Sequence, residues 1–170
     1  MAMMPTDPNA LMGAVQQQRG GAPMVKQTTP MIVKAYIQQQ YQGDRAGAQK
    51  ALSDIAKLAD IKMITFLQAG NTVFMINRVG MDGQYLPPFT ADVYIMSRET
   101  PELMPARVQE GLPALKQMGY KRLTIYTDDP MQAQAWQQAG QAMGAQVNAK
   151  PQMMNMGGGM APAYRIEVAV

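Results

Sequence analysis

The stretch Lys121–Val147 constrains the fold of this 170-residue chain more than any other segment. Its opening residues, Arg122–Thr127 (RLTIYT), are rich in the β-branched and aromatic types that are typical of a strand. Asp129 can cap a following helix, Met131–Met143, which begins after a proline and ends at a glycine. A second strand is expected at Gln146–Ala149. The stretch therefore predicts a strand, a helix and a strand in immediate succession.

The sequence ahead of this stretch predicts a helix and then an antiparallel meander. In Asp44–Ala59 apolar residues recur at i, i+3, i+4 and i+7, which indicates a helix capped by its first residue and packed on a sheet. Lys62–Leu67 and Thr72–Val79 flank a Gly-Asn pair suited to a hairpin turn, and Ala91–Ser97 is a third strand. Met31–Tyr41 (MIVKAYIQQQY) is expected to form a strand, or a strand leading into a turn.

Three segments complete the folded region. From Thr100 the chain is expected to make a short turn and then a bent helix, because Pro105 and Pro113 interrupt it. Pro151–Pro162 (PQMMNMGGGMAP) is expected to be a loop rich in Met and Gly. Tyr164–Val170 places its apolar residues on one face and closes the chain as a strand.

Residues 1–30 are expected to form a flexible N-terminal arm, and residues 31–170 a single domain. Prolines and glycines punctuate the arm too often for a long element, although a short helix at Asn9–Arg19 fits the spacing. Two interpretations stay open, namely a disordered chain end and a segment that becomes ordered on a partner. In the second, the arm contacts its partner through Leu11, Met12, Val15, Arg19 and Met24.

Composition excludes several classes of chemistry. The chain has no Cys and no His, which rules out disulfides, thiol nucleophiles and the commonest metal ligands, so we expect no metal site. Its net charge of +3 comes from scattered residues, which argues against nucleic acid as a specific ligand. No apolar run is long enough to span a membrane, and no secretory signal is evident, so we expect a cytoplasmic place of synthesis.

The order of predicted elements over Met31–Val170 resembles the GCN5-related N-acetyltransferase fold. The resemblance implies an α+β domain with a mixed, largely antiparallel central sheet flanked by helices. Members of that family splay a pair of neighbouring strands and hold acetyl-coenzyme A in the gap. Its pyrophosphate rests on backbone amides of a loop of the type Gln/Arg-x-x-Gly-x-Gly/Ala, which opens the next helix.

The corresponding stretch of this chain, Ser97–Gly111, departs from that pattern. It has no glycine before its last residue, and prolines 101 and 105 remove two amide donors. Glu99 and Glu102 place negative charge where phosphates would lie, and Arg98 and Arg107 would offset it only partially. These residues argue against tight coenzyme binding. If the chain is active, Arg98 and Arg107 are the cofactor-binding candidates.

The family's proton donor is also missing. The resemblance implies a Tyr four residues before a Gly-aromatic pair at the end of the last helix. Here Gly140 lies four residues before Gly144, and Ala145 replaces the aromatic residue. Asp92 and Glu99 are candidate catalytic carboxylates, although a charge facing solvent explains each more simply. Strand or loop packing explains Tyr120 and Tyr126, and Trp136 fits a core anchor, so we assign no catalytic residue.

Degenerate domains of this fold, without the coenzyme loop, occur in virion proteins of tailed bacteriophages, and the chain resembles them. The resemblance implies a structural protein without enzymatic activity or cofactor. It would assemble with other virion proteins, as a homo-oligomer or within a larger complex, and would be located in the virion. The alternative is an active, acetyl-CoA-dependent N-acetyltransferase with a divergent coenzyme loop.

Overall fold

The computed structural model describes residues 25–80, 82–155 and 159–170, which form a seven-stranded sheet flanked by four α-helices. The strands are β1 (Lys26–Thr28), β2 (Ile64–Ala69), β3 (Thr72–Asn77), β4 (Thr90–Ser97), β5 (Arg122–Thr127), β6 (Gln146–Asn155) and β7 (Met160–Ala169). Their order across the sheet is β1-β2-β3-β4-β5-β7-β6. Every neighbouring pair is antiparallel except β4 and β5, which are parallel. The predicted mixed, largely antiparallel sheet is confirmed.

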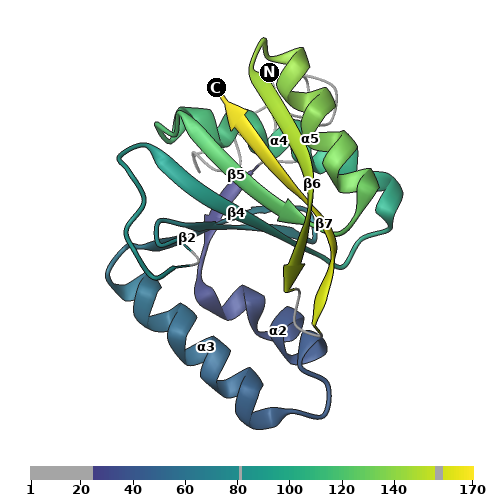
Figure 1. Cartoon of the computed structure of the whole chain (residues 1–170). Coiled ribbons are helices and arrows are strands. Elements are labelled where there is room, and N and C mark those ends of the chain that lie inside the picture. The colour runs from purple at the N-terminus through teal and green to yellow at the C-terminus, as the bar shows by residue number, and fades with distance from the viewer. Residues whose placement is uncertain (1–24, 81, 156–158) are drawn as a thin grey trace, which may run out of the picture.

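Helices cover the sheet from both sides. They are α2 (Lys34–Gln40), α3 (Arg45–Asp60), α4 (Met104–Gln117) and α5 (Pro130–Ala142), with short 3-10 turns η1 (Pro30–Val33) and η2 (Pro101–Leu103). Figure 1 shows α2 and α3 on one side of the sheet and α4 and α5 on the other. In the described region of the chain, none of these helices is long and apolar enough to cross a membrane.

Two apolar clusters hold the layers together, one on each face of the sheet. The larger cluster joins α4 and α5 to the sheet through residues that are almost fully buried, such as Phe74, Leu112, Ile125 and Trp136. The smaller one joins α2 and α3 to β2 and β3 through residues such as Ile55 and Phe66. Because side chains alternate along a strand, β2 and β3 are buried on both faces, as expected for the centre of a sheet.

The predicted helix capped by Asp44 is confirmed. The Asp44 Oδ1 atom accepts a hydrogen bond from the Gly47 amide at 2.9 Å, and the helix α3 begins at the next residue. The N-cap of α5 is confirmed in the same way, since Asp129 Oδ1 accepts from the Met131 amide at 3.0 Å. The turn and helix expected after Thr100 are η2 and α4, and Pro105 lies in the first turn of α4, where proline is tolerated.

The strand expected at Met31–Tyr41 is wrong, because this segment forms η1 and α2. Its buried residues, Val33 and Ile37, are four apart and face the sheet together, which is a helical spacing. The β-branched residues that suggested a strand therefore lie on one side of a helix. The sheet begins earlier instead, with β1 at Lys26–Thr28 paired to β2.

The loop expected at Pro151–Pro162 is also wrong over its described residues. β6 and β7 form one long hairpin in which Pro151 pairs with Tyr164 and Met153 with Pro162. β6 lies at the edge of the sheet, and β7 has no β5 residue beside it before Tyr164. Proline is tolerated at such places because its missing N–H faces no neighbouring strand.

Residues 1–24 lie outside the described region of the chain. The short helix expected at Asn9–Arg19 and the partner contacts expected of Leu11, Met12, Val15, Arg19 and Met24 fall on these residues. They stay predictions.

Candidate active site

The strands β4 and β5 diverge along their length. They pair over four positions, from Thr90 opposite Arg122 to Val93 opposite Ile125. Beyond these pairs, Tyr94–Ser97 of β4 has no partner in β5, although β3 still pairs with it on the other side. Because backbone groups of alternate residues point to opposite sides of a strand, this segment presents to the opening some N–H and C=O groups that no residue of β5 pairs. We call this opening the β4–β5 gap.

Two tyrosines lie where the pairing ends. The rings of Tyr94 on β4 and Tyr126 on β5 are stacked, with centroids 6.2 Å apart and an interplanar angle of 24°. Burial, and then the nearby Asp92 carboxylate, raise the pKa of Tyr94 to about 12. The Tyr94 hydroxyl therefore stays protonated at neutral pH and keeps a proton to donate beside the β4–β5 gap.

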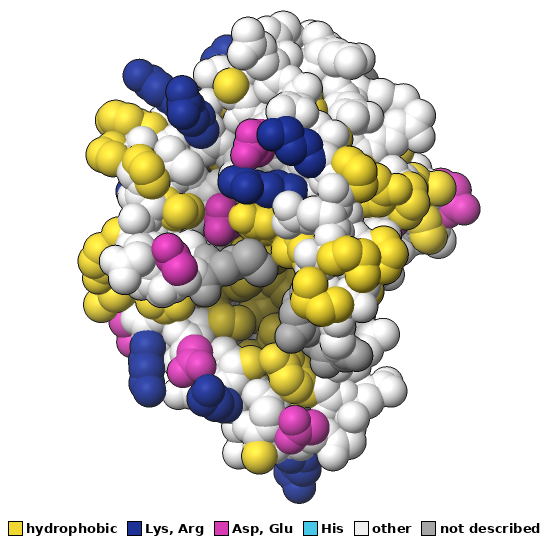
Figure 2. Space-filling model, viewed as in Figure 1, with side chains coloured by type: hydrophobic (Ala, Val, Ile, Leu, Met, Phe, Trp, Pro, Cys, Tyr) yellow, Lys and Arg dark blue, Asp and Glu magenta, His cyan; other side chains and the backbone are white. Residues whose placement is uncertain are grey.

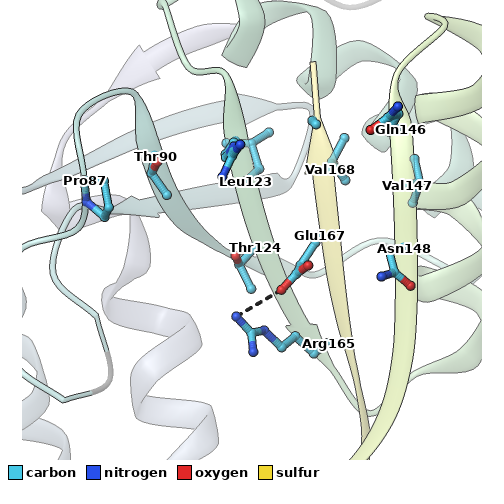
Figure 3. A pocket seen from close by; sticks show the side chains of 12 residues that line it. Pro87, Thr90, Leu123, Thr124, Gln146, Val147, Asn148, Arg165, Glu167 and Val168 are labelled. Carbon is cyan, nitrogen blue, oxygen red and sulfur yellow. Dashed lines mark ion pairs between the residues drawn. The ribbon is translucent and has the colours of Figure 1, made fainter.

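A row of polar side chains crosses the sheet next to the tyrosines. The strand registers place Asp92 beside Thr124, Thr124 beside Glu167, and Glu167 beside Asn148. Figure 3 shows Thr124, Glu167 and Asn148 side by side on three neighbouring strands. Their sequence neighbours Ala91, Val93, Leu123, Ile125, Ile166 and Val168 belong to the core under α4 and α5. The polar row therefore lies on the opposite face, away from α4 and α5.

Asp92 is the buried member of this row, since only 4% of its surface is exposed. Burial raises the pKa of its carboxyl from the ordinary 3.8 to about 6, while Arg165 lowers it and Asp82 raises it further. A carboxylate whose pKa lies near 6 accepts a proton far more readily than an ordinary aspartate at neutral pH. Asp92 therefore combines burial, a raised pKa and a position beside the β4–β5 gap.

A hollow of about 650 Å³ lies along the polar row, over β5, β7 and β6. Thr124, Asn148, Arg165 and Glu167 are among its lining residues, and Arg165 forms an ion pair with Glu167 at 3.1 Å (Figure 3). The hollow does not coincide with the β4–β5 gap, because it extends toward the opposite end of the strands, where Thr90 and Arg122 lie. Arg165 links the two, since it lines the hollow and acts electrostatically on Asp92.

The molecular surface over the candidate site has a charged part and a hydrophobic part. Figure 2 shows Lys, Arg, Asp and Glu side chains gathered over the region of the sheet that contains β4 and β5. Below them, between the sheet and helices α2 and α3, the surface is hollowed and its floor is hydrophobic. A polar ligand on the strands would thus have an apolar recess beside it.

The loop that follows β4 uses its own backbone amides. The Arg98 amide donates to Asn71 O at 3.1 Å, and the Glu99 amide donates to Ser97 Oγ at the same distance. The Leu103 amide donates to Thr100 O at 3.0 Å. The amides of these three residues are therefore not free for a ligand.

Arg107 is likewise engaged within the chain. Its Nε and Nη2 atoms donate to the two carboxylate oxygens of Glu99 at 2.8 and 2.7 Å, and its Nη1 atom donates to Glu110 Oε2 at 3.2 Å. Two carboxylates thus compensate one guanidinium. Arg98, the other cofactor-binding candidate, is exposed and lines a different hollow, beside α2, together with Lys34 and Tyr36. The structure does not bring Arg98 and Arg107 together as one cationic site.

Glu99 ties this loop to the β2–β3 turn. Its Oε1 atom accepts from the Asn71 amide at 3.0 Å and from Thr72 Oγ1 at 2.9 Å, and only 8% of its side chain is exposed. The β2–β3 turn can lie close to Arg107 because its residue 70 is a glycine with φ +59°. A Cβ added to Gly70 would lie 2.5 Å from an Arg107 nitrogen, which is too close. Glu99 is therefore a structural residue. The expectation that the charges of Asp92 and Glu99 face solvent is wrong, because both side chains are almost fully buried.

We expect Glu99→Ala to lower the free energy of unfolding at pH 7 by about 3 kcal/mol, because it leaves a largely buried guanidinium short of a partner. The Arg107 hydrogen bonds hold the pKa of Glu99 below its usual range. Its stabilising effect is thus present above the ordinary Glu pKa and is lost as pH falls through the lowered value. Urea denaturation of the variant and the wild type at pH 7 and at pH 3 measures the loss of stability and its dependence on pH. The exposed Glu102→Ala is the control, and an equal loss in both variants would contradict the assignment.

Gly140, the position that the resemblance assigns to a proton donor, packs closely against β6. A Cβ on Gly140 would lie 2.2 Å from Val147 Cγ2, so α5 packs too closely on β6 to carry a side chain there. Trp136 is confirmed as a core anchor, with no exposed surface and its ring edge-on to Phe74. Sequence reasoning missed Tyr94, Arg165 and Glu167 as site residues. The sequence signal that could have identified them is the alternation in β4 and β7, where polar residues occupy every second position and the other face is apolar.

Acetyl-CoA, the cofactor of the fold family, fits this chain only with its pantetheine half. The unpaired segment Tyr94–Ser97 suits the amide-bearing pantetheine arm, which needs backbone partners in a narrow opening. The loop after β4 suits the diphosphate poorly, because four of its amides are engaged and two of its positions are prolines, while its exposed cation, Arg98, lines the hollow beside α2.

Comparison with known proteins gives a fold and no sequence relative. No protein-family model matches the chain, and no curated protein matches its sequence. Solved structures do match. Spermidine N-acetyltransferase SpeG of Vibrio cholerae superposes with a TM-score of 0.59 at 5% identity, covering 86% of this chain and 94% of the other. The putative acetyltransferase yncA of Salmonella typhimurium, solved with its cofactor acetyl-CoA, gives 0.52 at 10% identity, with coverages of 86% and 92%.

A third match is the microcin self-immunity acetyltransferase MccE, solved in complex with acetyl-CoA and AMP. Its TM-score is 0.53 at 9% identity, and the match covers 86% of this chain and 92% of that one. These findings contradict two expectations. The main hypothesis of a non-catalytic virion protein is wrong, because these similar structures are acetyltransferases. The expectation of no cofactor is wrong as well, because two of them hold acetyl-CoA. The chain has the fold of the GCN5-related N-acetyltransferases.

Proposed function

We propose that this protein is an acetyl-CoA-dependent acyltransferase that acts on an amine. The observation that carries the proposal is the β4–β5 gap with a buried carboxylate of raised pKa, Asp92, beside it. A gap between diverging strands supplies a place for a thioester arm, and a proton acceptor supplies what an amine nucleophile requires. Each alone has a structural explanation, whereas their juxtaposition in this fold supports a transferase.

Asp92 is the proton acceptor of the proposed reaction. An amine that attacks an acyl carbon must lose a proton, and a carboxylate with a pKa of about 6 is deprotonated at neutral pH and ready to take it. Acetyl-CoA, when bound, would supply the acetyl group as a thioester, whose C–S bond would break as the amide C–N bond forms, so that coenzyme A leaves as its thiol. Tyr94, protonated at neutral pH, keeps a hydrogen-bond donor at the point where the strands diverge.

The acceptor amine would lie in the hollow along the polar row. Glu167 and Thr124 line this hollow, and the strand register places Asp92 next to Thr124, so an amine-bearing ligand at this end of the hollow would gain from both carboxylates. Arg165 is held by Glu167, so its positive charge is partly compensated. The row thus favours a primary amine over an anionic acceptor.

A thermal-shift titration of the full chain with acetyl-CoA tests the proposal. A ligand at 100 times its Kd adds about 2.7 kcal/mol of stability, which corresponds to a rise in Tm of roughly 5–10 °C for a domain of this size. The companion measurement is acetyl transfer to a panel of primary amines. Absence of any shift up to millimolar acetyl-CoA, together with absence of product, would contradict the proposed function.

A further inference from the structure

The entrance to the β4–β5 gap carries charge of the wrong sign for a nucleotide. Parallel strands end at the same edge of a sheet, so the loop after β4 and the turn after β5 both border the opening. The first contributes the exposed Glu102 and Glu99, whose charge Arg107 compensates, and the second contributes Asp128 and Asp129. Arg98, the exposed cation of the first loop, lines the hollow beside α2. The 3′-phospho-ADP half of coenzyme A is strongly anionic and would meet these carboxylates.

Backbone amides do not compensate for these carboxylates. A diphosphate site of this kind normally depends on free N–H groups at the start of a helix. Here η2 and α4 begin with Pro101 and Met104-Pro105, and the Met104 amide donates to Pro101 O. With the amides of Arg98, Glu99 and Leu103 also engaged, the loop offers a diphosphate few donors.

The nearby guanidinium does not compensate either. Arg107 is bound in a bidentate pair by Glu99 and also contacts Glu110, so releasing it for a phosphate would leave two carboxylates unpaired. The Glu99 carboxylate also holds the Asn71 amide and Thr72. Recruiting Arg107 would therefore dismantle the contacts between this loop and the β2–β3 turn.

We propose that the donor site recognises the acyl-pantetheine arm and gains little from the nucleotide. The chain then takes acyl-pantetheine thioesters as its donor class, and coenzyme A is one carrier among others. This inference rests on the proposed function, since it concerns the same gap. It follows from the unpaired backbone of Tyr94–Ser97 inside the gap and from carboxylates with engaged amides at its entrance.

The test compares acetyl-CoA with acetyl-pantetheine, which lacks the nucleotide, by calorimetric titration of the full-length protein. We expect dissociation constants within about tenfold of each other. Acetyl-CoA binding more than about tenfold more tightly would overturn the inference and leave the proposed function standing. Binding of neither ligand would overturn the proposed function itself, so the two failures are distinguishable.

A charge reversal at the entrance gives a second readout. Glu102 is exposed and lies in η2, so Glu102→Lys should not disturb folding. At low salt we expect it to strengthen acetyl-CoA binding on the order of fivefold and to leave acetyl-pantetheine binding unchanged. Asp54→Lys, on the exposed side of α3, is the matched control and should alter neither. Equal effects of Glu102→Lys on both ligands, or on neither, would overturn the inference.

Discussion

Asp92→Asn is expected to lower the rate of acetyl transfer at pH 7.5 by at least 100-fold, because asparagine has the shape of the carboxylate and cannot accept the amine proton. The same change is expected to make the protein more stable. The pKa of Asp92 is about 6 in the folded protein against an ordinary value of 3.8, so the folded state disfavours the charged form. At pH 8 the variant should gain on the order of 2–3 kcal/mol over the wild type.

The pH dependence of the stability gained by Asp92→Asn shows whether the gain comes from the raised pKa of Asp92. A raised folded pKa means that the contribution of Asp92 to stability is fully present below about pH 4 and is lost as pH rises through about 6. The difference between variant and wild type should therefore vanish near pH 4 and reach its plateau above pH 7. Urea denaturation across this range measures it, with the exposed Asp54→Asn as control. An active Asp92→Asn enzyme would remove Asp92 from the proposed mechanism.

Trp136→Ala is expected to cost about 3–5 kcal/mol, the largest loss of stability that we predict for a single substitution. Trp136 has no exposed surface and meets Phe74 in a T-shaped contact with ring centroids 6.2 Å apart. Its removal leaves a cavity between α5 and the sheet, and the edge-to-face contact is lost with it. The loss should appear as a lower urea midpoint with an unchanged slope.

Because Trp136 is the chain's single tryptophan, its substitution also removes the usual fluorescence signal. Circular dichroism should therefore follow unfolding in both proteins. Met131→Ala is the control, since Met131 lies on the same helix and is 45% exposed. We expect it to change stability by less than about 0.5 kcal/mol. A loss below about 1.5 kcal/mol for Trp136→Ala would mean that α5 is not packed on the sheet as described.

Much of the fold could be predicted because its signals are local. The caps at Asp44 and Asp129 and the β-branched and aromatic composition of the strand Arg122–Thr127 involve only neighbouring residues, and the structure confirms both caps and the strand. Met31–Tyr41 and Pro151–Pro162 failed for a different reason. Met31–Tyr41 was predicted as a strand from its residue types, although the spacing of its buried residues is helical. Pro151–Pro162 was predicted as a loop because its prolines were not known to lie at unpaired strand edges.

The candidate site was less predictable because strand register brings it together. Asp92, Thr124 and Glu167 come from three strands that are distant in sequence, and their adjacency depends on the crossover that places β7 beside β5. Neither the burial of Asp92 nor its raised pKa can be deduced from its neighbours in the chain. The differences between this loop and the family's coenzyme-binding loop could be recognised from the sequence. The structure adds that several of the loop's amides, and Arg107, already form hydrogen bonds within the chain.

The most direct test of the account is a crystal of the protein soaked with acetyl-CoA. We expect electron density for the acetyl-pantetheine arm between β4 and β5, with hydrogen bonds to the backbone of Tyr94–Ser97 and the acetyl group near Asp92. We also expect a weakly ordered nucleotide outside the opening. Density for the arm elsewhere, or an empty gap at saturating acetyl-CoA, would contradict the claim that this gap is an acyl-donor site.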